Sequence, residues 1–412
     1  MKVLHTADWH LGQRFQGEER TEEHRHFLFG QLLPLIEAEA VEALVIAGDV
    51  FDTGSPSNAA LDLYYSFLAN LRQSSCRHVV VVGGNHDSPA TLQAPQQALR
   101  HLGVTVVADL PAAAADQIIV LTDAAGQPAL VVGAVPYLRE RHLGLTTMGR
   151  TPDDIAAQVR AGIARHYAAV AALAAPHRAA GLPVLVTGHL FAAGLTCTEG
   201  MRDIQVGNLG QITADCFPDT FDYVALGHIH KPQTVGGQAR IRYAGSPVAL
   251  AFDEVDLPRR VVLLTFAAAP GTPAIAEKML PPLRRLLRFA GSPTAIADHL
   301  RQFVAVPEEL PAWFAVEVTD WDGLTALAGT AVVRAAELDR AAALRVLKIV
   351  PPAAARAASL AEAAAQGRHL RELTETEVFD ELLKQKRLTD EVSAGLRQTF
   401  RELLTWQGER GA

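Results

Sequence analysis

Short apolar runs, rich in β-branched residues, alternate with longer helical patterns from residue 1 to about residue 265 of the 412-residue chain. Several of these runs are apolar on both faces, which is typical of strands inside a sheet that is covered on both sides. The alternation predicts an α/β fold, a layered β-sheet core wrapped by helices. The strand-like runs are KVLHTAD (2–8), EALVIAGD (42–49), HVVVVGGN (78–85), ALVVGAVP (129–136), PVLVTGH (183–189), YVALGH (223–228) and RRVVLLTF (259–266).

Three stretches between these runs have the pattern of helices. Residues 23–40 and 59–73 carry apolar side chains three and four positions apart. Residues 160–181 form an alanine-rich helical pattern, which we expect Pro176 and Gly181 to help end.

Five of the predicted strands run directly into Asp, Asn or His. The carboxyl ends of strands in open α/β sheets are where ligands bind, so we expect these side chains to form one site. His228 and His230 are two positions apart in an extended segment, so they point to the same side. Glycine precedes four of the groups, and the missing β-carbon lets ligands crowd around a small centre. The groups are Asp8 and His10; Asp49 and Asp52 after Gly48; Asn85, His86 and Asp87 after Gly84; His189 after Gly188; and His228 and His230 after Gly227.

The residue types at these strand ends are ligands of divalent metal ions. Carboxylate, amide oxygen and imidazole without thiolate suit Mn²⁺, Fe²⁺ or Zn²⁺; we expect Mn²⁺, with Mg²⁺ or Fe²⁺ as alternatives. Seven candidate ligands exceed the needs of one ion, so we expect two ions that share the carboxylate of Asp49, which follows a central strand. Such a pair stabilises both oxygens of an in-line displacement at phosphorus. The candidate ligands are Asp8, His10, Asp49, Asn85, His189, His228 and His230.

The remaining polar residues of these motifs have other expected roles. His86 lies one position from Asn85 and is a candidate proton donor to a phosphate or to a departing oxygen. Asp87 could fix the tautomer of His86, and Asp52 could support the metal ligands in the same way. Each of these two aspartates could equally close a loop as an Asx turn.

The histidines outside these motifs have ordinary structural interpretations. We expect His5, within the first strand, to be buried and hydrogen-bonded. We expect His24 and eight further histidines to lie on helix or loop surfaces.

The pattern of predicted strands and helices changes after residue 281. A strand at 284–291, a helix from Ser292 to Phe303, a strand at 312–320, a helix to about Arg340 and a strand at 343–352 predict a small α+β domain at residues 282–352. Residues 353–366 are of low complexity, and two amphipathic helices follow them up to residue 412. The apolar stripes of these helices require another surface, either the body of this protein or a partner.

Composition limits the class of protein. No basic and apolar leader and no apolar run of membrane-spanning length is present, so we expect a cytoplasmic protein without membrane contact. Three scattered cysteines fit a reducing compartment and leave metal binding to nitrogen and oxygen. The net charge of −8 lacks the basic average of many nucleic-acid binders, although a local patch or bound cations can offset it.

With these motifs in view, the chain resembles the calcineurin-like metallophosphoesterases, and within them the family of SbcD nuclease subunits. The GH and GD pairs are signals of the superfamily, whereas GDVFDTGSPS and GSPVALAFDE are specific to the narrower family. The motifs that carry the likeness are LHTADWHLGQ, VIAGDVFDTGSPS, GGNHDSPATL, VTGHL, MRDIQVGNLG, YVALGHIHKPQ, YAGSPVALAFDE and ELTETEVFDELL.

The resemblance implies a role for each candidate residue of the site. It implies that Asp8, His10, Asp49 and His230 hold one metal ion and that Asp49, Asn85, His189 and His228 hold the other. It also implies that His86 is the catalytic histidine. Residues 1–281 would be the metallophosphoesterase nuclease domain, 282–352 a capping domain that helps to hold DNA, and 353–412 a linker and helices for a partner.

The resemblance further implies a substrate and partners. Members of the family act as 3′ to 5′ exonucleases on duplex DNA ends and as endonucleases on single strands and hairpins, in DNA repair, replication and recombination. They form homodimers, and an SbcC-type ABC ATPase with long coiled coils binds their C-terminal helices and gates access to DNA. The apolar faces of residues 61–71 and 91–102 could form the dimer interface, or could cover the sheet.

Three other functions are compatible with parts of the pattern. A protein phosphatase would use a similar metal site, but that branch carries arginine where this chain has Thr53 and glutamate where it has Asp87. A small-molecule phosphodiesterase would not need residues 282–412. A non-catalytic scaffold would be expected to have lost ligands, and none is lost.

Overall fold

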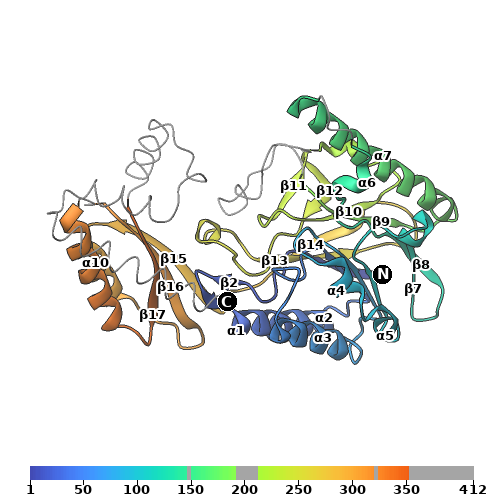
Figure 1. The fold of residues 1–412 in the computed structure, drawn as a ribbon. Coiled ribbons are helices and arrows are strands. Elements are labelled where there is room, and N and C mark those ends of the chain that lie inside the picture. The colour runs from blue at the N-terminus through green and yellow to red at the C-terminus, as the bar shows by residue number, and fades with distance from the viewer. Residues whose placement is uncertain (146–149, 192–211, 320–322, 352–412) are drawn as a thin grey trace. The chain divides into compact units, whose positions relative to one another are not determined.

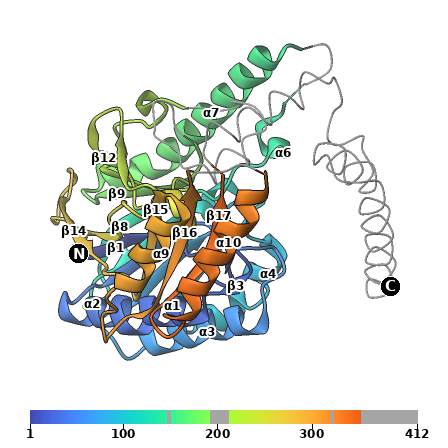
Figure 2. The same ribbon diagram turned by 90° about the vertical axis from the view of Figure 1, so that its left-hand side faces the viewer.

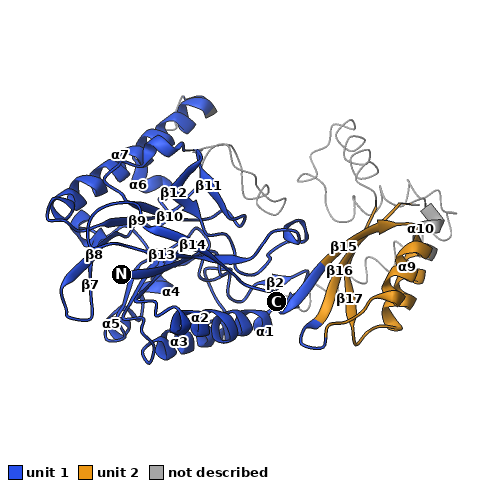
Figure 3. Cartoon of the chain, turned by 180° about the vertical axis from the view of Figure 1, so that it is seen from behind, with its two compact units in different colours: residues 1–286, 307–310 blue, residues 287–306, 311–412 orange. Residues whose placement is uncertain are grey.

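The computed structural model of the chain describes residues 1–145, 150–191, 212–319 and 323–351. They belong to two compact units, which Figure 3 shows in different colours. The first unit comprises residues 1–286 and 307–310, and the second comprises residues 287–306 and 311–412. The helices expected beyond residue 366 lie outside the described residues.

The first unit is built on two six-stranded sheets. All seven strand-like runs of the sequence are strands in these sheets, and the expected α/β class is confirmed. The first sheet has the order β14 (Ala274–Met279), β13 (Arg260–Thr265), β1 (Lys2–Thr6), β4 (Ala43–Ala47), β5 (His78–Val82) and β6 (Val104–Val107). The second has the order β11 (Gln233–Val235), β12 (Gln238–Tyr243), β10 (Tyr223–Gly227), β9 (Val184–His189), β8 (Pro128–Gly133) and β7 (Ile118–Thr122), and a separate hairpin pairs β2 (Arg14–Phe15) with β3 (Glu18–Glu19).

Alternating side chains of the strands build three apolar layers. In the first sheet, Leu44 faces the helices that cover the sheet, whereas its neighbour Val45 points toward the second sheet. In the second sheet, Ala225 joins Val45 between the sheets, whereas Val224 packs toward the opposite helices. Strands that are buried on both faces require apolar residues at every position, which explains the continuous apolar runs.

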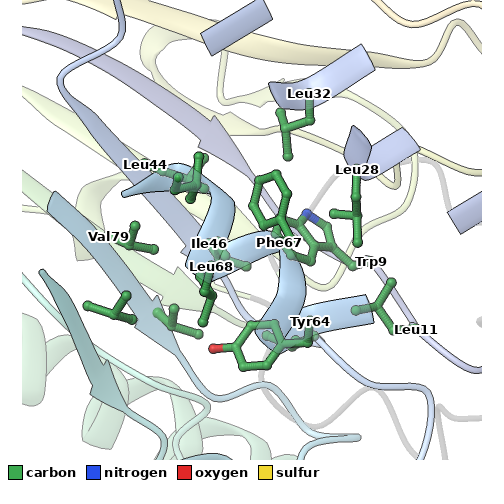
Figure 4. Packing of buried hydrophobic residues seen from close by; sticks show 14 of the residues in the cluster. Trp9, Leu11, Leu28, Leu32, Leu44, Ile46, Tyr64, Phe67, Leu68 and Val79 are labelled. Atoms are coloured by element: carbon green, nitrogen blue, oxygen red, sulfur yellow. The ribbon is translucent and has the colours of Figure 1, made fainter. Parts of the chain in front are cut away.

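Helices cover the outer face of the first sheet (Figure 1). Figure 4 shows Leu28, Leu32 and Phe67 packing there around Trp9. Of the faces considered for a dimer, residues 61–71 bury Leu63, Tyr64, Phe67, Leu68 and Leu71 against the sheet, and residues 91–102 bury Leu92 and Leu99. The covering elements are α1 (Thr21–Arg25), a π-helical stretch (His26–Leu32), α2 (Leu33–Ala38), α3 (Asn58–Leu71), α4 (Pro89–Gln93) and α5 (Gln96–Arg100).

The outer face of the second sheet packs against α7 (Pro152–Ala179), which follows the short α6 (Glu140–Leu143). The expectation that Pro176 helps to end this helix was wrong, because the helix continues to Ala179. Proline removes one backbone donor, but Tyr167 and Ala174 anchor the helix in the core. Gly181 follows with a φ of +92°, the left-handed conformation typical of a helix end. Among the described residues, we find no helix whose length and apolar character would allow it to cross a membrane.

The topology brings the carboxyl ends of five strands to one place. β1, β4 and β5 are adjacent parallel strands of the first sheet, and β9 and β10 are adjacent parallel strands of the second. Parallel neighbours end at the same edge of their sheet. Nδ1 of His189, at the end of β9, lies 2.9 Å from the carbonyl oxygen of Ala47, at the end of β4. The two edges therefore meet.

The second unit is a three-stranded sheet with two helices on one face, as Figure 2 shows. Ile296, Leu300 and Val333 of the helices pack against Phe314 and Val346 of the strands. The expected order of strand, helix, strand, helix and strand is present. The elements are β15 (Arg284–Gly291), α9 (Pro293–Gln302), β16 (Leu310–Val318), α10 (Gly323–Leu338) and β17 (Leu344–Val350).

Candidate metal centre

All eight residues that the sequence marked as ligands or proton donor lie together where the two sheet edges meet. The side chains of Asp8, His10, Asp49 and His189 are buried. Each comes from the end of one of five strands. Asp8 and His10 follow β1, Asp49 follows β4, Asn85 and His86 follow β5, His189 ends β9, and His228 and His230 follow β10.

The backbone is strained at these strand ends. In the described part of the chain, six non-glycine residues have a positive φ, and four of them are Asp8 (54°), His10 (46°), Asp49 (50°) and His228 (96°). A non-glycine residue in this region costs about 1–3 kcal/mol and persists only where the surroundings enforce it. Backbone hydrogen bonds help to do so, since the N–H of Asp8 donates to Gly48 and that of His10 to Asp49. Such concentrated strain is typical of a functional site.

Two glycines allow the side chains to crowd together. A Cβ at Gly48 would overlap the ring of His189, and a Cβ at Gly84 would overlap the carboxylate of Asp49. Gly48 also has a φ of +91°, which a residue with a side chain rarely adopts. The glycines that precede the polar residues in the sequence are therefore required by the close approach of the strands.

Two groups of potential ligand atoms lie side by side. One is formed by Asp8, His10 and His230, and the other by Asp49, His189 and His228, with the ligand atoms of each group within 4.8 Å of one another. Asn85 joins the second group, because its Oδ1 lies 3.0 Å from Nε2 of His189 and 2.9 Å from Nδ1 of His228. Two ligands bound at right angles about 2.1 Å from one ion are about 3.0 Å apart. The spacing therefore suits ligands of a common ion.

Asp49 lies between the two groups. Its Oδ2 is 3.1 Å from Nε2 of His189 in one group and 3.6 Å from Nε2 of His10 in the other. Its Oδ1 instead accepts the backbone N–H of His86 at 2.9 Å. One oxygen of Asp49 thus faces both groups.

Hydrogen bonds to groups outside the set of candidate ligands orient three of the histidine rings. Nδ1 of His10 lies 3.1 Å from Oδ1 of Asp52, which gives Asp52 the supporting position expected for it. Nδ1 of His189 donates to the carbonyl oxygen of Ala47, and Nδ1 of His230 lies 3.0 Å from Oε1 of Glu254. Because Nδ1 is engaged in each case, Nε2 is the nitrogen left for a metal.

The supporting role considered for Asp87 was wrong. Its carboxylate accepts three backbone N–H groups, from Gly84, Phe51 and Val50, at 2.9–3.2 Å, and so closes the loops after β4 and β5. His86 is oriented by a backbone group instead, since its Nδ1 lies 2.8 Å from the carbonyl oxygen of Asp52. The carboxylate of Asp87 therefore accepts backbone N–H groups and does not orient His86.

The expectations for two other histidines had different outcomes. His5 is buried and contacts the hydroxyl of Tyr223 at 3.1 Å, as expected. His24 was expected at the surface but is fully buried, and burial lowers its pKa to about 3. The helix that carries it contacts α3 and the π-helical stretch, and polarity alone does not reveal that His24 is buried there.

Sequence reasoning missed the role of Glu254. This buried carboxylate contacts His230 and also lies 3.1 Å from Nη1 of Arg259. The signal was present in the motif GSPVALAFDE, which contributed to the resemblance without any assignment of its acidic residues.

Known proteins resemble the chain over most of its length. Residues 1–232 match the family described as calcineurin-like phosphoesterase, and residues 282–387 match a domain described as the type 5 capsule protein repressor C-terminal domain. The SbcD subunit of the nuclease SbcCD from Escherichia coli K12 is 38% identical over 323 residues, 77% of this chain and 78% of that protein. The chain belongs to the SbcD family of calcineurin-like phosphoesterases. SbcD proteins of Rhodobacter capsulatus and Bacillus subtilis are 39% and 32% identical over 66% and 68% of the chain, and 68% and 69% of those proteins.

Calcineurin-like phosphoesterases bind divalent metal ions, and the residues of this SbcD family member fit such ions. Oδ2 of Asp8 and Nε2 of His10 are buried and have no hydrogen-bond partner among the described residues. Leaving a buried polar atom unpaired costs about 1–3 kcal/mol, so a ligand for these two atoms would stabilise the folded protein. A cation bound by both would satisfy them.

Two histidines carry protons in the metal-free site. Burial opposes the charge of His10, but its hydrogen bond with Asp52 and the negative charge of Asp49 outweigh burial and raise its pKa to about 9. Burial of His189 is likewise outweighed, chiefly by Asp49, and its pKa is also about 9. Burial dominates at His228, whose pKa falls to about 3.

Metal binding should therefore release protons. His10 and His189 are imidazolium at neutral pH, and a metal binds only the neutral ring. Affinity for Mn²⁺ should rise with pH until about 9, with about two protons released near pH 7. Calorimetric titration in buffers of different ionisation enthalpy measures this release. A heat of binding that does not depend on the buffer would contradict these protonation states of His10 and His189.

Proposed function

We propose that the chain is a metal-dependent DNA nuclease subunit with a dinuclear centre. The observation that carries the proposal is the position of Asp49, whose Oδ2 faces two separate groups of ligands. Mn²⁺ is the preferred ion for this mixture of carboxylate, amide and imidazole. One ion would bind Asp8, His10, Asp49 and His230, and the other would bind Asp49, Asn85, His189 and His228.

When bound, such a pair stabilises both the attacking and the departing oxygen of an in-line displacement at phosphorus. Asp49 holds the two halves of the site in register, and its Oδ1 positions the loop of His86 through the backbone N–H of that residue. The buried strands beneath the site keep these groups rigid, so little reorganisation is needed during the reaction.

His86 is placed to handle a proton. A carbonyl oxygen only accepts hydrogen bonds, so the contact with Asp52 assigns a proton to Nδ1 of His86. Its ring lies 4.8 Å from that of His10, beside the shared carboxylate. In the imidazolium form, Nε2–H can donate to the phosphate or to the departing oxygen.

The family suggests the substrate and the partners. The relatives named above are subunits of the nuclease SbcCD, and on that ground we propose 3′ to 5′ exonuclease action on duplex DNA ends and endonuclease action on single strands and hairpins. DNA repair, replication and recombination in the cytoplasm are the settings for this activity. We propose that residues 282–352 help to hold DNA, that residues 353–412 bind an SbcC-type ABC ATPase with coiled coils, and that the chain forms a homodimer.

An end-labelled hairpin duplex tests this function. The full chain, with and without its ATPase partner, is incubated with the hairpin in Mn²⁺ or Mg²⁺, beside a small chromogenic phosphodiester. We expect Mn²⁺-dependent cutting of the hairpin, with kcat/KM for DNA well above that for the small diester. Hydrolysis of the small diester without DNA cutting would favour the small-molecule phosphodiesterase. Binding of both metal ions without hydrolysis of either substrate would favour a non-catalytic scaffold.

A further inference from the structure

Glu254 is a buried carboxylate behind the Asp8 side of the metal centre. It lies in a short 3₁₀ turn, Phe252–Glu254, and its side chain is 0% exposed. Oε1 lies 3.0 Å from Nδ1 of His230. Oε2 accepts the backbone N–H of Leu250 at 3.0 Å and Nη1 of Arg259 at 3.1 Å. Both oxygens of this carboxylate are thus engaged, one by the imidazole and the other by two N–H donors.

The surrounding segment also contacts the other side of the same ligand group. Oγ of Ser246 lies 2.9 Å from the carbonyl oxygen of Asp8 and 2.6 Å from that of Val248, and Nη1 of Arg259 donates to the carbonyl oxygen of Ser246 at 3.2 Å. Arg259 is itself buried, so Glu254 and Arg259 form a charge pair that little solvent reaches. The segment from Ser246 to Arg259 thus contacts both Asp8 and His230.

We propose that Glu254 is a positioning residue that holds His230 in the tautomer with the proton on Nδ1, so that Nε2 is the ligand atom toward Asp8 and His10. The inference rests on the proposed metal centre and assigns one of its two halves a supporting carboxylate. An acceptor on Nδ1 fixes both the ring orientation and the tautomer, and it makes the opposite nitrogen more basic. The hydrogen bond from Nη1 of Arg259 also restrains the rotation of this carboxylate.

The contacts of Glu254 make glutamine an informative replacement. A glutamine has one oxygen and one NH₂ group, and two donors, Leu250 N–H and Arg259 Nη1, converge on the Oε2 position. The amide oxygen should take that position, and the NH₂ group should then face Nδ1 of His230. An NH₂ donor there requires an unprotonated Nδ1 and moves the ring proton to Nε2. The near-isosteric change thus blocks the ligand atom, whereas alanine only removes the acceptor.

The test is titration of metal-free full-length protein with Mn²⁺ alone, by calorimetry and by counting free Mn²⁺ with electron paramagnetic resonance. The wild type should bind two ions. Glu254→Gln should bind one ion with unchanged affinity and the other about 10- to 100-fold more weakly, and Glu254→Ala should be affected no more than Glu254→Gln. Equal binding of both ions by wild type and Glu254→Gln would overturn the inference.

A matched control separates positioning from general stability. Asp222 is also a buried carboxylate that accepts from an arginine, Arg178, at 2.6 Å and from the N–H of Val184. It precedes β10, whereas His228 and His230 follow that strand. Asp222→Asn should lower thermal stability and leave both ions bound. A loss of one ion in Asp222→Asn equal to that in Glu254→Gln would show a merely structural effect.

A direct reading of the tautomer distinguishes failure of this inference from failure of the proposed function. Ring ¹⁵N shifts of His230 in the metal-free protein, assigned by difference from His230→Gln, should show Nδ1–H in the wild type and Nε2–H in Glu254→Gln. An unchanged tautomer overturns the inference even if two ions bind. A wild type that binds no Mn²⁺ overturns the proposed centre whatever the tautomer.

Discussion

Replacing Asp49 by asparagine should reduce DNA cutting by about 10³-fold or more. The substitution keeps the shape of the side chain but removes the negative charge that faces both ligand groups. Each bound ion contributes several kcal/mol of transition-state stabilisation, and every 1.4 kcal/mol or so is tenfold in rate. The measurement is single-turnover cutting of the labelled hairpin at saturating Mn²⁺, together with the number of bound ions.

Asp222→Asn is the matched control for this variant, because it removes the charge of another buried, hydrogen-bonded carboxylate away from the centre. It should cut DNA at nearly the wild-type rate at a temperature where it is folded. If Asp49→Asn cut as fast as this control with both ions bound, Asp49 would not be the shared ligand.

His86→Ala should slow the cutting by about 10²- to 10⁴-fold, the usual contribution of a proton donor, while both metal ions stay bound. The reason is the position of His86 beside the shared carboxylate, with Nδ1 tied to the carbonyl oxygen of Asp52. Rates and metal content should be measured on the same samples. The expected result is a fall in kcat with little change in the affinity for Mn²⁺.

The structure also indicates an alternative role for His86, that of a metal ligand. His86 forms a third group of potential ligand atoms with His10 and Asp49, so loss of an ion in His86→Ala would make it a ligand rather than a proton donor. His166→Ala is the control, since this histidine lies on α7 and contacts Gln117. That variant should retain both its cutting rate and its metal ions.

Much of the arrangement of the candidate ligands could be predicted because each lies at the end of a strand or shortly after it. The apolar runs identify β1, β4, β5, β9 and β10, and parallel strands end at a common edge whatever the details of packing. Gly48 and Gly84 also indicated the position of the site, because a side chain at either position would overlap His189 or Asp49. Local sequence and global topology therefore agree at the site.

Other contacts could not be predicted, because no sequence pattern relates the residues that they join. Glu254 reaches His230 across 24 residues and depends on the course of the loop that follows β12. Asp87 had two expected roles, and its contacts with backbone N–H groups of the β4 loop are those of a residue that closes the loop rather than one that supports His86. His24 is buried on a helix that contacts α3 and the π-helical stretch. Each outcome depends on three-dimensional packing.

Anomalous scattering at the manganese edge, from crystals of the full chain soaked in Mn²⁺, tests the central claim most directly. Two peaks about 3.5–4 Å apart should lie on either side of Asp49, one beside Asp8, His10 and His230 and the other beside Asn85, His189 and His228. A single peak, or no peak beside Asp49, would contradict the dinuclear centre.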